Sequence, residues 1–465
     1  MKVTDYDNVY FLGIGGIGMS SLARWFVDRN KQVAGYDRTP SPLTDRLSAE
    51  GMDIHFEDNL NFIPDQFKDP ETTLVIYTPA IPKNHAELNF FNSSGFKVYK
   101  RSEVLGLITK DHKTLAVAGT HGKTTTSTML AHLLFDADMN MEGLLGGIAT
   151  NYNSNLLLNR KDEDPVVVVE ADEFDRTFLR LNPNSAIITN MDADHLDIYG
   201  DHSELVKSFN DFIKLIPKGN KVYFHYSLKD KLEDQVRANG QVGISYGINE
   251  GDIQASNIRV ENNAFVFDFE YKSAGIKIDG LVLHQPGFHN VLNAIAAGAM
   301  ALDNGLSVEK LVSGLDSYLG VKRRFEYISI TEKSVFIDDY AHHPTEISSL
   351  VDSVRKLYPE KKMTLIFQPH LYTRTRDFAD GFAASLDKAD DVLLLPIYPA
   401  REEPIEGVNS ELILGKMNNP NKIIVEKEDL LALLRAREPE LILTVGAGDI
   451  DREVIRIKNM IEAEL

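Results

Sequence analysis

The sequence lacks the features that mark several classes of protein. It contains no cysteine, which excludes disulfides and thiolate chemistry. No apolar run approaches the roughly 18 residues that a membrane-spanning helix needs, so we expect no membrane partner. The first ten residues hold no apolar core of signal-peptide length, and we therefore expect a cytoplasmic location.

Positive charge is also scarce. Lys and Arg number 49 against 69 Asp and Glu, which gives a formal net charge of −20. Proteins that bind nucleic acid need a basic face, so the composition argues against a nucleic-acid partner. A local basic pocket for a small anionic substrate is compatible with this balance.

The sequence does contain a repeated alternation of apolar strands and helices. Its 465 residues, 43% of them apolar, suggest two to four domains. The alternation predicts an α/β fold with parallel sheets, whereas residues 253–283 alternate in polarity and predict an antiparallel insertion. Strands are expected at Asn8–Leu12, Gln32–Asp37, Thr73–Tyr77, Val166–Val169, Ser185–Asn190, Val335–Tyr340, Thr364–Gln368, Val392–Leu395 and Leu441–Val445, with helices at Met19–Asn30 and His289–Asn304.

The most informative segment predicts a polyphosphate site. An apolar strand ending at Ala118 leads through a glycine turn into a helix that begins with a lysine and three threonines. Backbone N–H groups and the helix dipole favour an anion at such a turn. Lys123 would reach the terminal phosphates and Thr124 could ligate Mg²⁺. Because Val117 stands where the Walker pattern has its first glycine, the loop is a shortened variant. It comprises Gly119, Thr120, His121, Gly122, Lys123, Thr124 and Thr125.

A second glycine turn follows the first strand. Gly13, Gly15 and Gly18 match Gly-x-Gly-x-x-Gly, and Asp37 ends the next strand. This pattern admits a diphosphate and bonds a ribose hydroxyl, so a dinucleotide and a UDP-linked ligand fit it equally well. The substrate-binding residues predicted in this region are Gly15, Gly16, Ile17, Gly18, Asp37 and Thr78.

Candidate metal ligands follow two strands of the middle region. Glu170 comes directly after the valine run, where a carboxylate beside a phosphate loop is placed to hold Mg²⁺. His195, among acids near the end of the next strand, is a second candidate ligand. Asn290 and Asn293 could read an adenine edge or cap a helix, and the sequence leaves both open.

Basic and aromatic residues gather after the strands expected in the last third of the chain. Arginine offers forked donors to carboxylates and phosphates, and open α/β sheets bind ligands at strand ends. We assign catalytic roles to His343 and Arg374 beside Lys123 and His195. The remaining candidates are Arg324 for the cofactor and Tyr340, His342, His370, Arg376 and Arg401 for the substrate.

Taken together, these motifs resemble the Mur ligases along nearly the whole chain. The resemblance rests on Gly-Ile-Gly-Gly-Ile-Gly-Met-Ser, Gly-Thr-His-Gly-Lys-Thr-Thr-Thr, Glu-Ala-Asp-Glu, Ala-Asp-His-Leu-Asp, His-Asn-Val-Leu-Asn-Ala, Asp-Asp-Tyr-Ala-His-His-Pro-Thr-Glu and Tyr-Thr-Arg-Thr. It implies a UDP-substrate-binding Rossmann-like domain (1–105), a central ATP-binding P-loop domain (106–320) and a C-terminal Rossmann-like amino-acid domain (321–465). The sequence departs from the family's usual pattern at Phe174, often Ser, and at Leu371, often Arg.

The resemblance also implies a reaction. UDP-N-acetylmuramate, L-alanine and ATP would give an amide through an acyl phosphate, with Mg²⁺ held by Thr124, Glu170 and His195 and adenine near Asn290 and Asn293. We expect a monomer or weak homodimer. One alternative is a recycling ligase that adds a tripeptide to UDP-N-acetylmuramate. Two further alternatives belong to other functional classes. An NAD-dependent oxidoreductase would leave Lys123 unexplained. A non-catalytic nucleotide-gated binding protein would leave the C-terminal cluster of basic residues unexplained.

Overall fold

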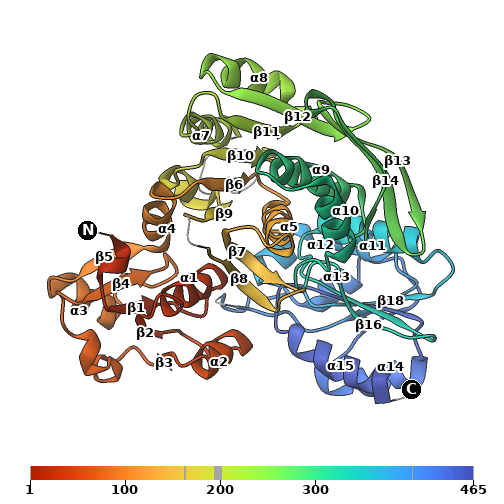
Figure 1. The fold of residues 1–465 in the computed structure, drawn as a ribbon. Helices are drawn as coiled ribbons and strands as arrows, with labels where there is room; N and C mark the ends of the chain where they lie inside the picture. The colour runs from red at the N-terminus through yellow and green to blue at the C-terminus, as the bar shows by residue number, and fades with distance from the viewer. Residues whose placement is uncertain (1, 162–163, 193–201, 401, 464–465) are drawn as a thin grey trace. The chain divides into compact units, whose positions relative to one another are not determined.

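The computed structural model describes residues 2–161, 164–192, 202–400 and 402–463. The chain divides into two compact units (Figure 1). The first comprises Met1–Arg259, Val266–Leu283 and Phe288–Tyr318, and the second Val260–Phe265, His284–Gly287 and Leu319–Leu465. The strands of the described residues form three sheets, two in the first unit and one in the second.

The N-terminal sheet of the first unit is parallel, with the strand order β3-β2-β1-β4-β5. Strand β1 lies in the middle and is buried along its whole length, as expected for a strand covered on both faces. The elements are β1 (Asn8–Leu12), α1 (Ile17–Val27), β2 (Gln32–Tyr36), α2 (Pro42–Ala49), β3 (Asp53–His55), β4 (Thr73–Tyr77), α3 (Ala86–Ser93), β5 (Lys97–Lys100) and α4 (Arg101–Lys110).

The central sheet of this unit is mixed, with the order β15-β14-β13-β12-β11-β10-β6-β9-β7-β8. Its strands run parallel from β12 to β7, and β8 pairs antiparallel with β7. The elements are β6 (Thr114–Ala118), α5 (Lys123–Asp136), β7 (Met141–Ala149), β8 (Ser154–Asn159), β9 (Val166–Ala171), β10 (Ser185–Ile188), α7 (His202–Lys214), β11 (Lys221–His225), α8 (Lys229–Ala238), β12 (Val242–Ile248), β13 (Ile253–Glu261), β14 (Ala264–Tyr271), β15 (Ile276–Leu283), α9 (Phe288–Asp303) and α10 (Val308–Ser317).

Strands β13 to β15 cover the residues predicted to form an antiparallel insertion, and they extend this central sheet; β13 itself pairs parallel with β12. Neighbouring strands β13 and β14 are joined by Asn262 and Asn263, whose φ angles are 50° and 61°. Two connecting residues at positive φ form a hairpin turn, which only antiparallel strands permit.

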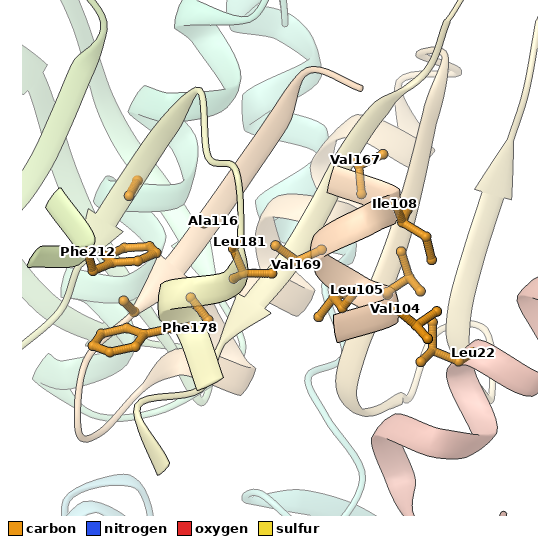
Figure 2. Packing of buried hydrophobic residues seen from close by; sticks show 14 of the residues in the cluster. Leu22, Val104, Leu105, Ile108, Ala116, Val167, Val169, Phe178, Leu181 and Phe212 are labelled. Atoms are coloured by element: carbon orange, nitrogen blue, oxygen red, sulfur yellow. The ribbon is translucent and has the colours of Figure 1, made fainter. Parts of the chain in front are cut away.

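One buried apolar cluster joins the two sheets of the first unit. Figure 2 shows Leu22 of α1, Val104 and Leu105 of α4 and Val169 of β9 among its members. Helices α1 and α4 therefore pack in the same core as the central strands. Burial of each such side chain stabilises the fold by about 1.5–3 kcal/mol, so this cluster holds the two sheets together.

The sheet of the second unit has the order β16-β17-β21-β18-β19-β20. All its pairs are parallel except β16 with β17. The elements are β16 (Glu326–Ile330), β17 (Val335–Asp339), α11 (Pro344–Leu357), β18 (Met363–Phe367), α12 (Tyr372–Leu386), β19 (Asp391–Leu394), α13 (Ser410–Leu414), β20 (Lys422–Ile424), α14 (Lys427–Arg437), β21 (Leu441–Val445) and α15 (Asp451–Ala463).

The α/β class and the expected strands are confirmed, with small shifts at element ends. Helix α1 begins within the glycine turn, two residues before the predicted start, and ends before Asn30, whose φ of 59° is left-handed. Helix α4 runs through the predicted limit at residues 105–106, and the exact domain limits stay a prediction. None of the helices in the described part of the chain has the length and apolarity required to cross a membrane.

Candidate active site

The phosphate loop connects β6 to α5 and depends on two glycines. Gly119 has a φ of 140° and Gly122 a φ of 80°, values that side chains rarely adopt. A Cβ at Gly119 would overlap Thr189 Oγ1. Both glycines therefore allow the backbone to curl before the first N–H groups of α5, which lack acceptors within the helix.

Residues after the neighbouring strand hold this loop in shape. Asn190 Oδ1 accepts hydrogen bonds from Thr120 Oγ1 at 2.6 Å and from the His121 N–H at 2.8 Å. Thr189 Oγ1 donates to the His121 carbonyl at 2.5 Å. Strand β10, which precedes them, is paired with β6, so the loop is clamped from the adjacent strand end.

Lys123 points back over the loop and pairs with a buried carboxylate. Its Nζ donates to the Gly119 carbonyl at 2.7 Å and lies 2.9 Å and 2.8 Å from the two carboxylate oxygens of Glu173. Burial raises the pKa of Glu173, and the Lys123 ammonium opposes that rise. The sequence had offered no specific role for Glu173, because only the fold brings it to the lysine.

Asn293 of α9 lies beside the phosphate loop and is hydrogen-bonded to Asn290. A Cβ at Gly122 would lie 3.1 Å from Asn293 Oδ1, and Asn293 Nδ2 donates to Asn290 Oδ1 at 3.2 Å. Helices α5 and α9 pack side by side (Figure 1). Since α9 begins at Phe288, both asparagines lie inside it, and the capping interpretation is wrong.

Glu170 has the features of a cation ligand. It lies on β9, where it pairs with Val117 of the loop strand β6. Its Oε2 is buried and has no hydrogen-bond partner among the described residues. A buried carboxylate oxygen without a partner is costly unless a cation is bound. Carboxylate and hydroxyl oxygens suit Mg²⁺, so Glu170 and the buried Thr124 fit that ion.

The remaining predicted ligand cannot be placed, because His195 lies outside the described residues. Within the described part of the chain, no cluster of three His, Asp or Glu side chains could hold a metal on its own. The magnesium site therefore stays a prediction, supported by the oxygen atoms of Glu170 and Thr124.

The N-terminal glycine turn is held by its own aspartate. Gly13 has a φ of 88°, and a Cβ there would lie 2.5 Å from Thr78 Cγ2. Asp37 Oδ2 accepts a hydrogen bond from the Gly15 N–H at 2.7 Å. Asp37 thus shapes the loop, and its predicted contact with a ribose is untested.

A cavity of about 250 Å³ links this turn to the central sheet. It is lined from one side by Gly16, Ile17, Gly18 and Thr78, and from the other by Glu170 and Asp172. These four predicted substrate residues and the candidate metal ligand therefore face the same space, whereas Gly15 and Asp37 do not line it. A concave site with a few converging polar groups is the expected form of a small-molecule site.

Arg101 also lines the cavity and was missed from the sequence. Its Nη2 lies 3.7 Å from Asp172 Oδ2, and it begins α4 directly after β5. Its place at a strand end of the same sheet as Thr78 was the available signal, but a single arginine outside any motif gave no reason to select it.

In the second unit, several predicted residues come together. The His342 and His370 rings lie 6.5 Å apart, and His370 stacks on Tyr398 at 5.9 Å. Burial lowers the pKa of His342, and the charges of Arg374 and Arg324 lower it further, against the effect of Glu346. This cluster therefore favours a neutral imidazole among arginines, an arrangement suited to an anionic ligand.

Tyr340 lies beside this cluster. Its ring contacts His342 edge-on at 5.3 Å, and its backbone N–H donates to Arg323 O at 2.6 Å. Just before it, Asp339 accepts from the N–H groups of Phe325 and Ala341 at 2.7 Å each. Burial raises the pKa of Asp339 to about 6. These bonds set the path of the backbone through Tyr340.

Other predicted residues of this unit have local partners. His343 is the N-cap of α11 and contacts Thr345 Oγ1 through Nδ1 at 2.8 Å. Arg376 pairs with Asp377 at 2.8 Å, and Arg401 lies outside the described residues. Leu371, one of the two departures noted from the sequence, has a φ of 71° at the start of α12. The catalytic role of His343 and the substrate role of Arg376 stay predictions.

Comparison with known proteins gives a consistent result along the chain. Residues 8–113 match the Mur ligase family catalytic domain, residues 117–301 the Mur ligase middle domain, and residues 323–448 the Mur ligase glutamate ligase domain. A UDP-N-acetylmuramate–L-alanine ligase of Flavobacterium johnsoniae is 48% identical over 466 aligned positions, covering 100% of both chains.

Two solved structures are similar to this chain over nearly its whole length. The UDP-N-acetylmuramate–alanine ligase of Thermotoga maritima has a TM-score of 0.83 at 27% identity, covering 98% of this chain and 100% of that one. A murein peptide ligase of Psychrobacter arcticus has a TM-score of 0.68 at 25% identity, covering 97% and 98%. The glycine turn and Glu170 line one cavity, and the family models and the 48% identical relative match from end to end; the chain therefore belongs to the Mur ligase family.

Proposed function

We propose that this protein joins L-alanine to the lactyl carboxylate of UDP-N-acetylmuramate at the expense of ATP, in the synthesis of peptidoglycan precursors. The observation that carries the proposal is the shared cavity, which the N-terminal glycine turn lines together with Glu170. The full-length relative at 48% identity bears the name of this reaction. A cytoplasmic location and a monomer or weak homodimer are part of the proposal.

The first step assigned to the site is phosphoryl transfer from ATP to the carboxylate, which gives an acyl phosphate and ADP. Its barrier comes from crowding of negative charge. Lys123 offers an ammonium at the loop, and the α5 N-terminus offers N–H groups. Thr124, Glu170 and His195 would hold Mg²⁺, which when bound neutralises charge on the phosphates. Asn293, beside Gly122, supports adenine binding at the α9 side.

The second step is attack of the alanine amine on the acyl phosphate, with release of phosphate. We assign binding of the amino acid to the second unit, where His342, His370 and Arg374 gather. Arginine pairs with a carboxylate in a forked geometry, which suits the carboxylate of an amino acid. The domain limits at 105 and 320 follow the same division of tasks.

One experiment tests this reaction and its nearest rival together. Phosphate release is measured with ATP, Mg²⁺ and UDP-N-acetylmuramate, and L-alanine, glycine, L-serine and L-Ala-γ-D-Glu-meso-diaminopimelate are compared as acceptors. L-Alanine is expected to give the highest kcat/KM. A higher kcat/KM for the tripeptide would instead indicate the recycling reaction. This alternative is included because the chain is also similar to a murein peptide ligase. The absence of acceptor-dependent phosphate release, together with NADH binding, would favour an oxidoreductase.

A further inference from the structure

Helix α1 is held by a part of the chain far from it in sequence. Its first residues line the cavity through Ile17, Gly18, Met19 and Ser21, and the helix packs against strands β7 and β8 of the central sheet. The contact is polar as well as apolar: Trp25 Nε1 donates to the buried Glu142 Oε2 of β7 at 2.7 Å. The position of the glycine turn is thus set partly from outside its own sheet.

The closest of these contacts is made by Asn155 of β8, which is fully buried. Its Nδ2 donates to the carbonyl of Ile17 at 2.6 Å and to Ser20 Oγ at 2.9 Å. Its Oδ1 accepts from Arg24 Nη1 at 2.5 Å, and its backbone carbonyl accepts from Ser21 Oγ at 3.0 Å. The side-chain amide is therefore committed to the first two turns of α1.

Asn155 is also tied to the opposite wall of the cavity. The next residue of β8, Leu156, pairs with Leu144 of β7, and Leu144, Leu145 and Gly146 line the cavity. Gly146 is packed so closely on Glu170 that a Cβ there would overlap its carboxylate. The β7–β8 hairpin therefore contacts the glycine turn through Asn155 and the candidate metal ligand through Gly146.

We propose that Asn155 is a positioning residue: it fixes the first turn of α1, and with it the diphosphate-binding turn, at a set distance from Glu170. The inference rests on the proposed function, in which that turn binds the diphosphate of UDP-N-acetylmuramate. Phosphoryl transfer requires the reacting atoms to lie within about 3–3.5 Å of each other. A substrate bound at the glycine turn reaches that distance only if the turn is held in place relative to the wall that contains Glu170.

The test compares Asn155→Leu with Asn159→Leu in the full chain. Leucine nearly matches asparagine in shape and adds no charge that could repel a diphosphate. Asn159 lies on the same strand but donates to Asp138 and to the Met139 carbonyl, not to α1. UDP-N-acetylmuramate is titrated calorimetrically without ATP, and the KM for ATP is measured at saturating UDP-N-acetylmuramate and L-alanine.

We expect N155L to weaken binding of UDP-N-acetylmuramate about tenfold with the KM for ATP unchanged, and N159L to match the wild type. If N155L does not fold, Ser20→Ala removes one acceptor of the same amide and is expected to weaken binding about threefold. Unchanged affinity in a folded variant, or equal losses for UDP-N-acetylmuramate and ATP, would overturn the inference. A flat titration with the wild type would instead remove the proposed function on which it rests.

Discussion

Lys123 Nζ lies 2.8 Å from Glu173 Oε2, and the glutamate side chain is completely buried. The lysine of the phosphate loop is thus paired with a buried carboxylate. The pair keeps an ammonium in place where phosphates are expected, and nucleotide binding must compete with Glu173 for it.

Replacing Glu173 with alanine should destabilise the nucleotide-free protein. The change leaves the mostly buried Lys123 ammonium without its carboxylate, and removing one partner of a buried ion pair costs roughly 3–5 kcal/mol. Urea unfolding measures the loss. As a control, Asp211→Ala breaks an exposed pair with Lys214 and should change the free energy of unfolding by less than about 0.5 kcal/mol. Equal losses of unfolding free energy in the two variants would show that the buried pair stabilises the protein no more than the exposed pair does.

Lys123→Ala should lower turnover by about 10²-fold or more, because loss of one charge-stabilising donor typically has this effect. Phosphate release at saturating substrates measures it. Lys214→Ala removes an exposed lysine of α7 and serves as the matched control. A near-normal rate in the Lys123 variant would contradict the role of this residue in phosphoryl transfer.

Glu170→Gln should raise the Mg²⁺ concentration needed for half-maximal activity by about tenfold or more, as lost metal-site interactions usually do. The amide keeps the shape but removes the negative charge from the buried, partnerless oxygen. Thr124→Val is expected to shift the same titration, whereas Glu204→Gln on the surface of α7 should leave it unchanged. An unaltered magnesium titration in both site variants would exclude them as ligands.

Gly119→Ala should weaken ATP binding by about tenfold or more. The added Cβ would overlap Thr189 Oγ1, and φ is 140°, so the loop must move. Gly51→Ala is the control: its φ is 95°, but nothing lies within 4 Å of the added Cβ. That variant should lose about 1–2 kcal/mol of stability through backbone strain alone and keep its ATP affinity. Retained ATP affinity in Gly119→Ala would show that the loop tolerates a side chain.

The N-terminal sheet carries a pH-dependent element outside the site. Glu87 is fully buried and accepts from Tyr10 Oη at 2.8 Å, and burial raises its pKa from 4.5 to about 7. The folded state therefore binds more protons than the unfolded state between these values, and stability from this group falls as pH rises through that window.

Glu87→Gln should accordingly gain stability relative to the wild type between pH 5 and pH 8, by roughly 3 kcal/mol. The neighbouring His55 is present in both proteins, so its titration contributes to both stability profiles. Urea unfolding followed by the fluorescence of Trp25, the single tryptophan of the chain, measures the difference. If the difference in unfolding free energy between variant and wild type stays constant over this pH range, the pKa of Glu87 is not raised by burial.

Much of the fold and part of the site could be predicted because their signals are local. The phosphate loop needs an apolar strand, two glycines and Lys123 in succession, and all lie within a few residues. The strands from Asn8–Leu12 to Leu441–Val445 were found because continuous apolar runs are typical of buried parallel strands. The ends of helices were less certain, since α1 starts inside its glycine turn.

Contacts between distant segments could not be predicted. Glu173 was visible as an acid in a run of acids, but its pairing with Lys123 depends on the adjacency of β6 and β9. Arg101 and Asn155 stand in no motif. Their importance arises only when α4 and β8 are placed beside the glycine turn.

The amino-acid sequence alone therefore determined which segments form strands, which turns have the glycine pattern typical of phosphate binding and which family the chain resembles, since backbone conformation at a glycine turn is decided by neighbouring residues. Only the tertiary structure decided which side chains face one another across the cavity. Sheet order and register are set by burial of the whole apolar core, and no short stretch of sequence contains that information.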